Sequence, residues 1–373
     1  MNKSKKVIIV FGTRPEAIKM APIIKAFLRD GNINPVVCVT GQHKEMLYQV
    51  LDFFQITPDY DLELMTANQS LCGLTARAVK GVEEVMHREK PDMVLVQGDT
   101  TTAFTGAYVG FLNKVPVGHV EAGLRTGNKA EPFPEEVNRR LIGQVADLHF
   151  CPTDVAAGNL IAEQTTDAVH VLGNTVIDAL LAGTALLGDS WKPSPTELGA
   201  MATAEKSVLI TLHRRETFGG ELDELLNALD RLATDHPETE FIFPVHPNPN
   251  VRNPVIERLS GLENLKIIDP LDYPNFIWAM SKATLILTDS GGVQEEAPSL
   301  GVPVLVARKV TERQEGVDAG VAELVGTDEE VVYAAANKLL ANPSKHQIPN
   351  PYGDGHASER IVATCIEFLN TSK

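Results

Sequence analysis

The stretch Thr288 to Glu296 combines glycines and polar side chains that suit a phosphate group. It follows an apolar run of strand length, 283–287, and precedes a stretch of helical pattern. Gly291 and Gly292 would let backbone N–H groups approach a ligand, and a helix start offers unpaired N–H donors and a positive dipole end. Ser290 adds a hydroxyl. No Lys-Ser/Thr pair follows, so this is not a Walker A loop, and taken alone it could be an ordinary strand-to-helix turn.

Nearly all of the polar clusters in this chain come immediately after a predicted strand. Each cluster has a structural explanation: Asp99 before threonines is a good helix cap, and acids such as Glu135 in a first helical turn stabilise the helix dipole. His213 beside Arg214 and Arg215 is harder to explain, because three potential cations repel one another unless an anion lies among them. Together, the clusters predict a ligand site rather than capping alone. They are 12–16, 98–102, 121–125, 213–216, 246–249, 290–292 and 311–313.

Three further residues in or near these clusters can be interpreted in two ways. Glu121 follows a strand directly, where Asp or Ser would be commoner, and this favours a buried or ligand-facing carboxylate. His246, between a strand and prolines, could be an ordinary loop histidine. Lys19 lies one helical turn after Arg14 and could extend into solvent.

The hydrophobic pattern behind the clusters alternates short apolar runs with amphipathic stretches, which is typical of α/β proteins. Strands are predicted at 7–11, 35–40, 92–97, 115–120, 148–151 and 169–172. Helices are predicted at 16–29, 44–53, 70–88, 100–112 and 135–145. This order predicts a doubly wound domain, whose parallel sheet would bind ligands at the carboxyl ends of its strands.

The stretch 187–203 is rich in Pro, Gly, Ser and Thr and is predicted to be a surface loop. After it, strands are predicted at 207–212, 240–244, 264–268, 283–287 and 303–306. Helices are predicted at 221–235, 293–300, 328–340 and 357–369. We therefore predict two Rossmann-like domains that face a cleft lined by the polar strand ends.

Composition limits the class of ligand. The 373 residues suggest two domains, and 43% hydrophobic content is enough for sizeable cores. The net charge of -16 argues against nucleic-acid binding. Because global charge is screened beyond roughly 8 to 10 Å at physiological salt, an anionic ligand would depend on cations in its own site.

The sequence lacks a recognisable targeting signal, and we therefore expect a cytoplasmic protein. No apolar run reaches membrane-spanning length, so no membrane association is expected. The lysines near the start and the run 7–11 resemble a signal peptide only superficially, since charged residues follow at once. The scattered cysteines, Cys38, Cys72, Cys151 and Cys365, form no CxxC pair, which favours free thiols over disulfides or a zinc site.

Eight motifs carry a resemblance to a known family: 12–22, 97–100, 119–126, 134–139, 211–216, 244–248, 289–296 and 311–316. They resemble, in order and nearly end to end, those of the non-hydrolysing UDP-N-acetylglucosamine 2-epimerases. The resemblance implies the two-domain GT-B fold, with a final helix that returns to the first domain. The implied domains are 1–172, 173–352 and, for the returning helix, 353–373. The resemblance also implies a homodimer.

The implied reaction interconverts UDP-N-acetylglucosamine (UDP-GlcNAc) and UDP-N-acetylmannosamine (UDP-ManNAc) by inversion at sugar C2. That C2–H has no adjacent carbonyl, so simple deprotonation would leave an unstabilised carbanion. Oxidation by a nicotinamide is disfavoured, because no GxGxxG follows any predicted strand. The family route eliminates UDP to give 2-acetamidoglucal, then adds UDP back with protonation on the opposite face. It needs two acid/base groups and cations for the leaving diphosphate, but no cofactor and no metal.

The resemblance also implies roles for individual residues. Proton transfer and positioning at C2 would fall to Asp99, Glu121 and Glu135, with Asp99 and Glu135 as the transferring pair. The departing diphosphate would be stabilised by Arg14, Lys19 and His213. The remaining contacts to UDP would come from Ser290, Gly291 and Gly292 at the phosphates, Glu296 at the ribose, Phe276 near the uracil, and Arg313.

Some bacterial members of the family bind a second UDP-GlcNAc as an activator beside the active site. The residues that match this neighbourhood are Gln42, His43, Arg214, Arg215 and His246. Where those members carry an arginine, this chain has Met65-Thr66-Ala67-Asn68-Gln69, so one cation of the activator site is absent.

Three other functions remain open at this point. A GT-B glycosyltransferase would share the fold, but three carboxylates on the first domain are unusual for one. A hydrolysing 2-epimerase would release ManNAc and UDP after the same elimination. A non-catalytic sensor of UDP-sugars is disfavoured, because the acid/base set is complete.

Overall fold

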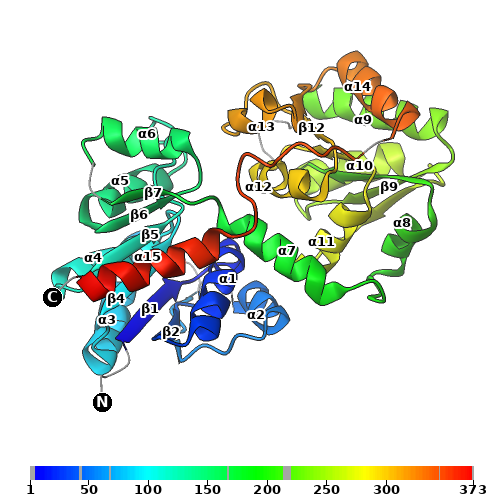
Figure 1. Ribbon diagram of the computed structural model, residues 1–373. Helices are drawn as coiled ribbons and strands as arrows, with labels where there is room; N and C mark the ends of the chain where they lie inside the picture. The colour runs from blue at the N-terminus through cyan, green and yellow to red at the C-terminus, as the bar shows by residue number, and fades with distance from the viewer. Residues whose placement is uncertain are drawn as a thin grey trace. The chain divides into compact units, whose positions relative to one another are not determined.

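The computed structural model describes residues 5–41, 44–66, 69–165, 168–212, 220–343 and 345–371. The chain forms two compact units (Figure 1). Unit 1 comprises Met1–Ala179 and Tyr352–Lys373, and unit 2 comprises Leu180–Pro351. None of the helices in the described ranges has the length and apolar character that crossing a membrane requires.

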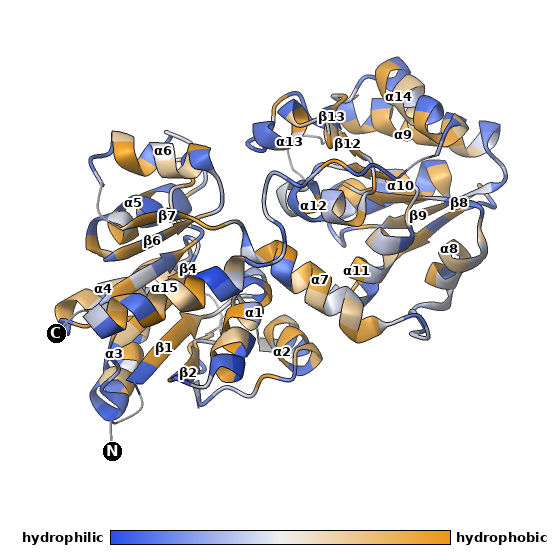
Figure 2. Cartoon of the chain, viewed as in Figure 1, coloured by the Kyte–Doolittle hydropathy of each residue, from blue (hydrophilic) through white to orange (hydrophobic). Residues whose placement is uncertain are grey.

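Unit 1 is built on a seven-stranded parallel sheet in the order β3-β2-β1-β4-β5-β6-β7. Its strands are β1 (Lys5–Phe11), β2 (Ile33–Val39), β3 (Tyr60–Asp61), β4 (Met93–Gln97), β5 (Val117–Val120), β6 (Leu148–Cys151) and β7 (Val169–Val171). The central strands β1 and β4 are buried over residues 7–11 and 93–97 and are apolar there except at Gln97, as in a sheet covered by helices on both faces (Figure 2).

The connecting helices of unit 1 are α1 (Arg14–Asp30), α2 (Lys44–Phe53), α3 (Leu71–Glu89), α4 (Thr101–Leu112), α5 (Glu135–Val145) and α6 (Asp154–Ala162). Helix α7 (Thr175–Leu187) follows β7 and crosses the boundary between the units. The last helix, α15 (Ala357–Thr371), packs against α1 (Figure 1). The predicted return of the C-terminal helix to the N-terminal region is therefore confirmed.

The strand order of unit 1 reverses at β1, which lies between β2 and β4. Chain connections leave β1 and β4 in opposite directions, so their following loops diverge at the carboxyl edge. Ligands of doubly wound sheets bind at such a switch point. The loops that begin at Gly12 and Gly98 lie there.

Unit 2 repeats the arrangement with six parallel strands in the order β10-β9-β8-β11-β12-β13. They are β8 (Lys206–Thr211), β9 (Thr239–Pro244), β10 (Leu265–Ile268), β11 (Leu285–Thr288), β12 (Val304–Val306) and β13 (Ala322–Leu324). The helices are α8 (Ala200–Thr203), α9 (Gly220–Asp235), α10 (Pro249–Leu259), α11 (Tyr273–Lys282), α12 (Gly291–Glu296), α13 (Gln314–Asp318) and α14 (Glu329–Ala341). The switch point lies between β8 and β11.

The predicted fold class is confirmed, and most predicted elements lie within a few residues of the observed ones. The prediction for 187–203 is wrong in part, because it contains a 3-10 turn (Thr196–Gly199) and α8. The predicted helix 293–300 is a short α-helix followed by a 3-10 turn. Pro298 explains the change, since it lacks the N–H that a continuing α-helix would use. The pattern missed β3, α6, α7, α13 and β13.

Candidate functional site

The loop after β1 is tied to the loop after β4 by a buried carboxylate. Glu16 Oε2 accepts hydrogen bonds from the backbone N–H groups of Gly12 at 3.0 Å and Thr13 at 2.7 Å. Its Oε1 accepts from the hydroxyl of Thr100 at 2.7 Å. Burial raises the pKa of Glu16, although these hydrogen bonds act against the rise. Helix α1 begins directly after this loop, with Arg14 as its first residue.

At the end of β5, three donors from the described part of the chain contact the Glu121 carboxylate. Lys19 forms an ion pair with its Oε1, and the amide of Gln97 donates to its Oε2. Asn174 Nδ2 lies 3.3 Å from Oε1. The side chain of Glu121 is 7% exposed, so the reading of a buried or ligand-facing carboxylate agrees with its surroundings.

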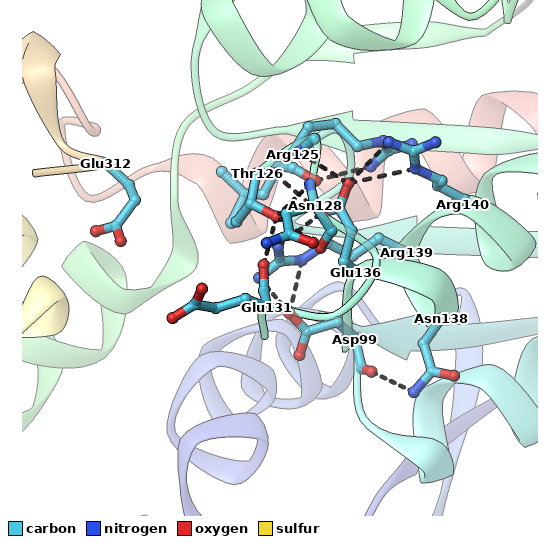
Figure 3. Close-up of polar contacts among 12 residues, drawn as sticks. Asp99, Arg125, Thr126, Asn128, Glu131, Glu136, Asn138, Arg139, Arg140 and Glu312 are labelled. Carbon is cyan, nitrogen blue, oxygen red and sulfur yellow. Dashed lines mark hydrogen bonds and ion pairs between the residues drawn. The ribbon is translucent and has the colours of Figure 1, made fainter. Parts of the chain in front are cut away.

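Asp99 follows β4, and it is not the cap of the next helix. Thr100 caps α4 instead, with its Oγ1 accepting from Ala103 N at 3.0 Å. The Asp99 carboxylate contacts Arg139, whose Nε and Nη2 lie 2.8 and 2.7 Å from Oδ2. The backbone oxygen of Asp99 accepts from Asn138 Nδ2 at 2.8 Å (Figure 3). Capping therefore does not explain the aspartate.

Helix α5 begins with Glu135 and Glu136, whose environments differ. Glu136 is fully buried and surrounded by hydrogen-bond donors (Figure 3). Glu135 is partly exposed and makes no side-chain hydrogen bond or ion pair with another described residue. Of these two neighbours, Glu135 is the one that remains available to a ligand.

Two other residues of the 119–126 motif have partners within unit 1. His119 is buried, with Nε2 at 2.7 Å from Gly98 O, and burial lowers the pKa of its imidazole to about 3. Arg125 Nε and Nη2 lie 2.9 and 2.8 Å from the carboxylate of Glu163. His119 and Arg125 are therefore paired within unit 1, and Glu121 is the carboxylate of this motif at the end of β5.

In unit 2, the stretch that suggested a phosphate site spans the turn from β11 into α12, as the predicted strand-to-helix turn requires. Ser290 precedes α12, and its backbone N–H donates to Thr288 Oγ1 at 2.9 Å. A side-chain carbon at Gly291 would lie 3.1 Å from Cζ of Arg313. Glycine at position 291 therefore leaves space for the guanidinium of Arg313, and this packing alone accounts for a glycine there without any ligand.

Arg313 is held beside α12 by an acid of that helix. Its Nε lies 2.9 Å from Oε1 of Glu295, which is buried. Glu296, the predicted ribose contact, is also buried, at 7% exposed. The structure brings Arg313 together with the glycine pair at one strand end.

The remaining predicted residues are more dispersed. Phe276 lies in α11 and is partly exposed. His246 is exposed, and its Nδ1 accepts from Asn248 N at 3.1 Å, which is an ordinary loop arrangement. The other predicted residues lie outside the described part of the chain: His213, Arg214, Arg215, Gln42 and His43.

Several residues that hold the candidate carboxylates are missing from the sequence-based site. Arg139 and Glu136 lie inside the motif 134–139, and their place in this motif is the sequence feature that could have identified them. Asn174 lies in no motif, and only its contact with Glu121 reveals it. Within the described ranges, no group of three His, Cys, Asp or Glu residues is arranged to hold a metal ion.

This chain is similar to known proteins along most of its length. A family model described as UDP-N-acetylglucosamine 2-epimerase matches residues 25–366. A probable UDP-N-acetylglucosamine 2-epimerase of Ralstonia solanacearum is 50% identical, over 96% of this chain and 98% of the relative. The UDP-N-acetylglucosamine 2-epimerase of Escherichia coli strain K12 is 48% identical, over 96% of this chain and 97% of the relative.

The fold of this chain is also similar to that of a solved structure. The UDP-GlcNAc 2-epimerase of Neisseria meningitidis, crystallised with UDP-GlcNAc, is 45% identical with a TM-score of 0.85, covering 97% of this chain and 100% of that one. Sequence and fold agree along almost the whole length of this chain. This chain therefore belongs to the UDP-N-acetylglucosamine 2-epimerase family.

Proposed function

We propose that this protein interconverts UDP-GlcNAc and UDP-ManNAc by inverting C2 of the sugar. The observation that carries the proposal is the near-complete match to relatives named for this activity, one of them 48% identical over 96% of this chain. Such a reaction needs carboxylates, and unit 1 offers Asp99 and Glu121 after strand ends and Glu135 at the start of α5. Asp99, Glu121 and Glu135 are all described, and none serves as the N-cap of a helix.

The chemistry proceeds by elimination and re-addition. A carboxylate removes the proton from C2 while the C1–O bond to UDP breaks, which leaves 2-acetamidoglucal with a C1–C2 double bond. The diphosphate oxygen then adds back to C1, and a second carboxyl delivers a proton to the opposite face of C2. Asp99 and Glu135 are the transferring pair, and Glu121 positions the sugar. For this role, each of the two carboxyl groups must lie within hydrogen-bonding distance of the C2 proton that it removes or delivers.

The leaving diphosphate needs positive charge and directed donors. Arg14, Lys19 and His213 supply charge, although Lys19 also holds Glu121. Arg313 supplies a further guanidinium. Donors to the phosphates come from Ser290, Gly291 and Gly292, the ribose contact from Glu296, and the uracil neighbour is Phe276.

Solvent exchange tests this function. In deuterated water, the protein is expected to form UDP-ManNAc with deuterium at C2, without added cofactor and with little free UDP. Release of free ManNAc and UDP in place of UDP-ManNAc would favour a hydrolysing enzyme. UDP-sugar that keeps its C2 hydrogen throughout would contradict the proposal.

Asp99→Asn is expected to abolish C2 exchange and leave UDP binding nearly intact, because the amide cannot accept the proton. Asp92→Asn is the matched control. Asp92 precedes the same strand at its opposite end, where its carboxylate accepts from Lys6 N at 2.7 Å. Calorimetric titration with UDP and NMR of the exchanged sugar measure the two effects. Loss of UDP binding by a folded Asp99→Asn variant would remove Asp99 from this role.

We also propose a homodimer formed through an apolar patch on α4 and α5. Tyr108, Phe111 and Leu112 lie on one helical face of α4 and are 39% to 55% exposed. Leu141, on the neighbouring α5, is 43% exposed. Exposed apolar clusters of this kind mark interaction sites.

We place the protein in the cytoplasm, since its four scattered cysteines favour a reducing compartment.

Light scattering after gel filtration tests the dimer. The wild type is expected at twice the chain mass of 40.5 kDa, and Phe111→Glu at the chain mass. Val331→Glu is the control, because Val331 is similarly exposed, at 49%, in α14 of unit 2. A wild type that elutes as a monomer, or a Phe111→Glu variant that remains dimeric, would contradict this surface.

A further inference from the structure

Glu136 is a fully buried carboxylate that the proposed reaction does not use. Its oxygens accept five hydrogen bonds from four residues. The donors are Thr126 N at 3.0 Å, Gly127 N at 3.2 Å, Arg139 Nη1 at 3.2 Å, and Arg140 Nε and Nη2 at 3.3 and 3.1 Å. An isolated buried charge would be very costly, so this carboxylate depends on its whole set of donors.

Arg139 is shared between this buried carboxylate and Asp99. One edge of its guanidinium, Nη1, contacts Glu136, while Nε and Nη2 contact Asp99 Oδ2 (Figure 3). A guanidinium is planar, and its donors have fixed directions. Holding one edge against a buried anchor therefore fixes where the other edge points.

The peptide groups beside Asp99 are held as well. His119 Nε2 lies 2.7 Å from Gly98 O, and Asn138 Nδ2 lies 2.8 Å from Asp99 O. With its backbone fixed on both sides, the Asp99 side chain retains rotation about its own bonds. Among the described residues, Arg139 is the one whose side chain contacts the Asp99 carboxylate and restricts this rotation.

We propose that Glu136 is a positioning residue for the epimerisation, acting through Arg139 to aim the Asp99 carboxylate. By accepting from Thr126 and Gly127, it also joins the loop after Glu121 to the start of α5, where Glu135 lies. The inference rests on the proposed function and adds a residue to it. A misplacement of about 1 Å at a reacting group can cost roughly 10²-fold in rate.

Glu136 itself is unsuited to transfer a proton. Burial alone would raise its pKa, but hydrogen bonds from Thr126 N, Arg140, Gly127 N and Arg139 outweigh burial and lower it. A buried group that stays ionised is a fixed anchor rather than an acid. The neighbouring Glu135, which is partly exposed, keeps the catalytic assignment.

Glu136→Gln tests the proposal, because glutamine keeps the size but presents an NH₂ group to donors. We expect kcat to fall about 10²-fold, while KM and the affinity for UDP change by less than about twofold. Glu163→Gln is the matched control. It breaks the paired hydrogen bonds between Glu163 and Arg125 in the same unit, and it is expected to keep kcat within about twofold.

Arg139→Lys provides a second variant if Glu136→Gln does not fold. Arg139 is 15% exposed, and a lysine ammonium cannot hold both carboxylates in the fork geometry, so kcat is expected to fall by a similar factor. The double variant should lose no more than the worse single variant, since both changes break one chain of contacts. A purely structural role would instead give multiplying losses, or losses that follow thermal stability.

Three results would overturn the inference: folded Glu136→Gln with kcat within about twofold of wild type, a loss confined to KM, or an equal loss in Glu163→Gln. The proposed function is judged separately, by the wild type. A wild type that does not exchange C2 hydrogen would contradict the function. An active wild type with an unaffected Glu136→Gln would contradict only the role of Glu136.

Discussion

Glu121 has a left-handed backbone conformation, with φ of 62°, in the loop after β5. Such a conformation costs a non-glycine residue of order 1–2 kcal/mol and persists when the surroundings over-determine it. Lys19, Gln97 and Asn174 supply those surroundings by holding the carboxylate. Strain of this kind is common at active sites, and it agrees with a role for Glu121 at the sugar.

Gly123, two residues further, is required by close packing. A side-chain carbon there would lie 2.1 Å from the carbonyl oxygen of Ala156, and φ is 91°. Gly123→Ala is therefore expected to lower the free energy of unfolding by at least about 3 kcal/mol, from strain and overpacking together. Gly127→Ala is the control, with φ of 78° and open space, and it should cost about 1–2 kcal/mol. Equal losses in chemical denaturation would show that packing at Ala156 is unimportant.

At the scale of elements, α15 is fastened to unit 1 by a buried cap. Asp178, in α7, accepts hydrogen bonds from the backbone N–H groups of Ser358 at 2.7 Å and Ala357 at 3.3 Å. These are unpaired donors of the first turn of α15, which a cap must satisfy. The contact joins residues about 180 positions apart, and it returns the end of the chain to α1.

Asp178→Ala is expected to lower stability by roughly 1–3 kcal/mol, because it leaves buried donors without an acceptor. Amide hydrogen exchange should accelerate in α15 more than in the other helices. Asp328→Ala removes the exposed cap of α14, which accepts from Val331 N at 3.1 Å, and should cost about 1 kcal/mol without affecting α15. Unchanged exchange in α15 of the Asp178→Ala variant would contradict the capping role.

At the scale of the whole molecule, burial couples stability to pH. His119 lies in β5 beside His149 of β6, and burial lowers the pKa of both imidazoles, that of His119 to about 3. Above the unfolded-state pKa of about 6.5 both states are neutral. As pH falls below that value, the unfolded chain binds a proton that the folded His119 rejects, so stability is lost toward pH 3.

The free energy of unfolding is therefore expected to fall between about pH 6 and pH 5, by up to about 1.4 kcal/mol per pH unit from His119. His119→Gln keeps a donor for Gly98 O and should reduce this slope. His87→Gln is the control, since His87 is exposed. Urea titrations across this range measure the slope. A slope that is identical in wild type and His119→Gln would contradict neutral burial of the imidazole.

The sequence by itself determined the alternation of strands and helices, the parallel sheets and the polar strand ends. These features depend on short-range periodicity and on glycines and prolines at turns, which are visible in any local window. The order of the motifs also sufficed to identify the family. Helix 293–300 shows the limit of the pattern, because Pro298 changed its geometry within a correctly placed element.

Only the tertiary structure decided which residue holds which carboxylate. Both Glu135 and Glu136 suit a first helical turn, and the packing of α5 alone buries one and leaves the other partly exposed. The partners of Glu121 lie 24, 53 and 102 positions away in the chain, at Gln97, Asn174 and Lys19. Contacts between such distant residues arise when the strand ends converge at one edge of the sheet, and no local pattern encodes them.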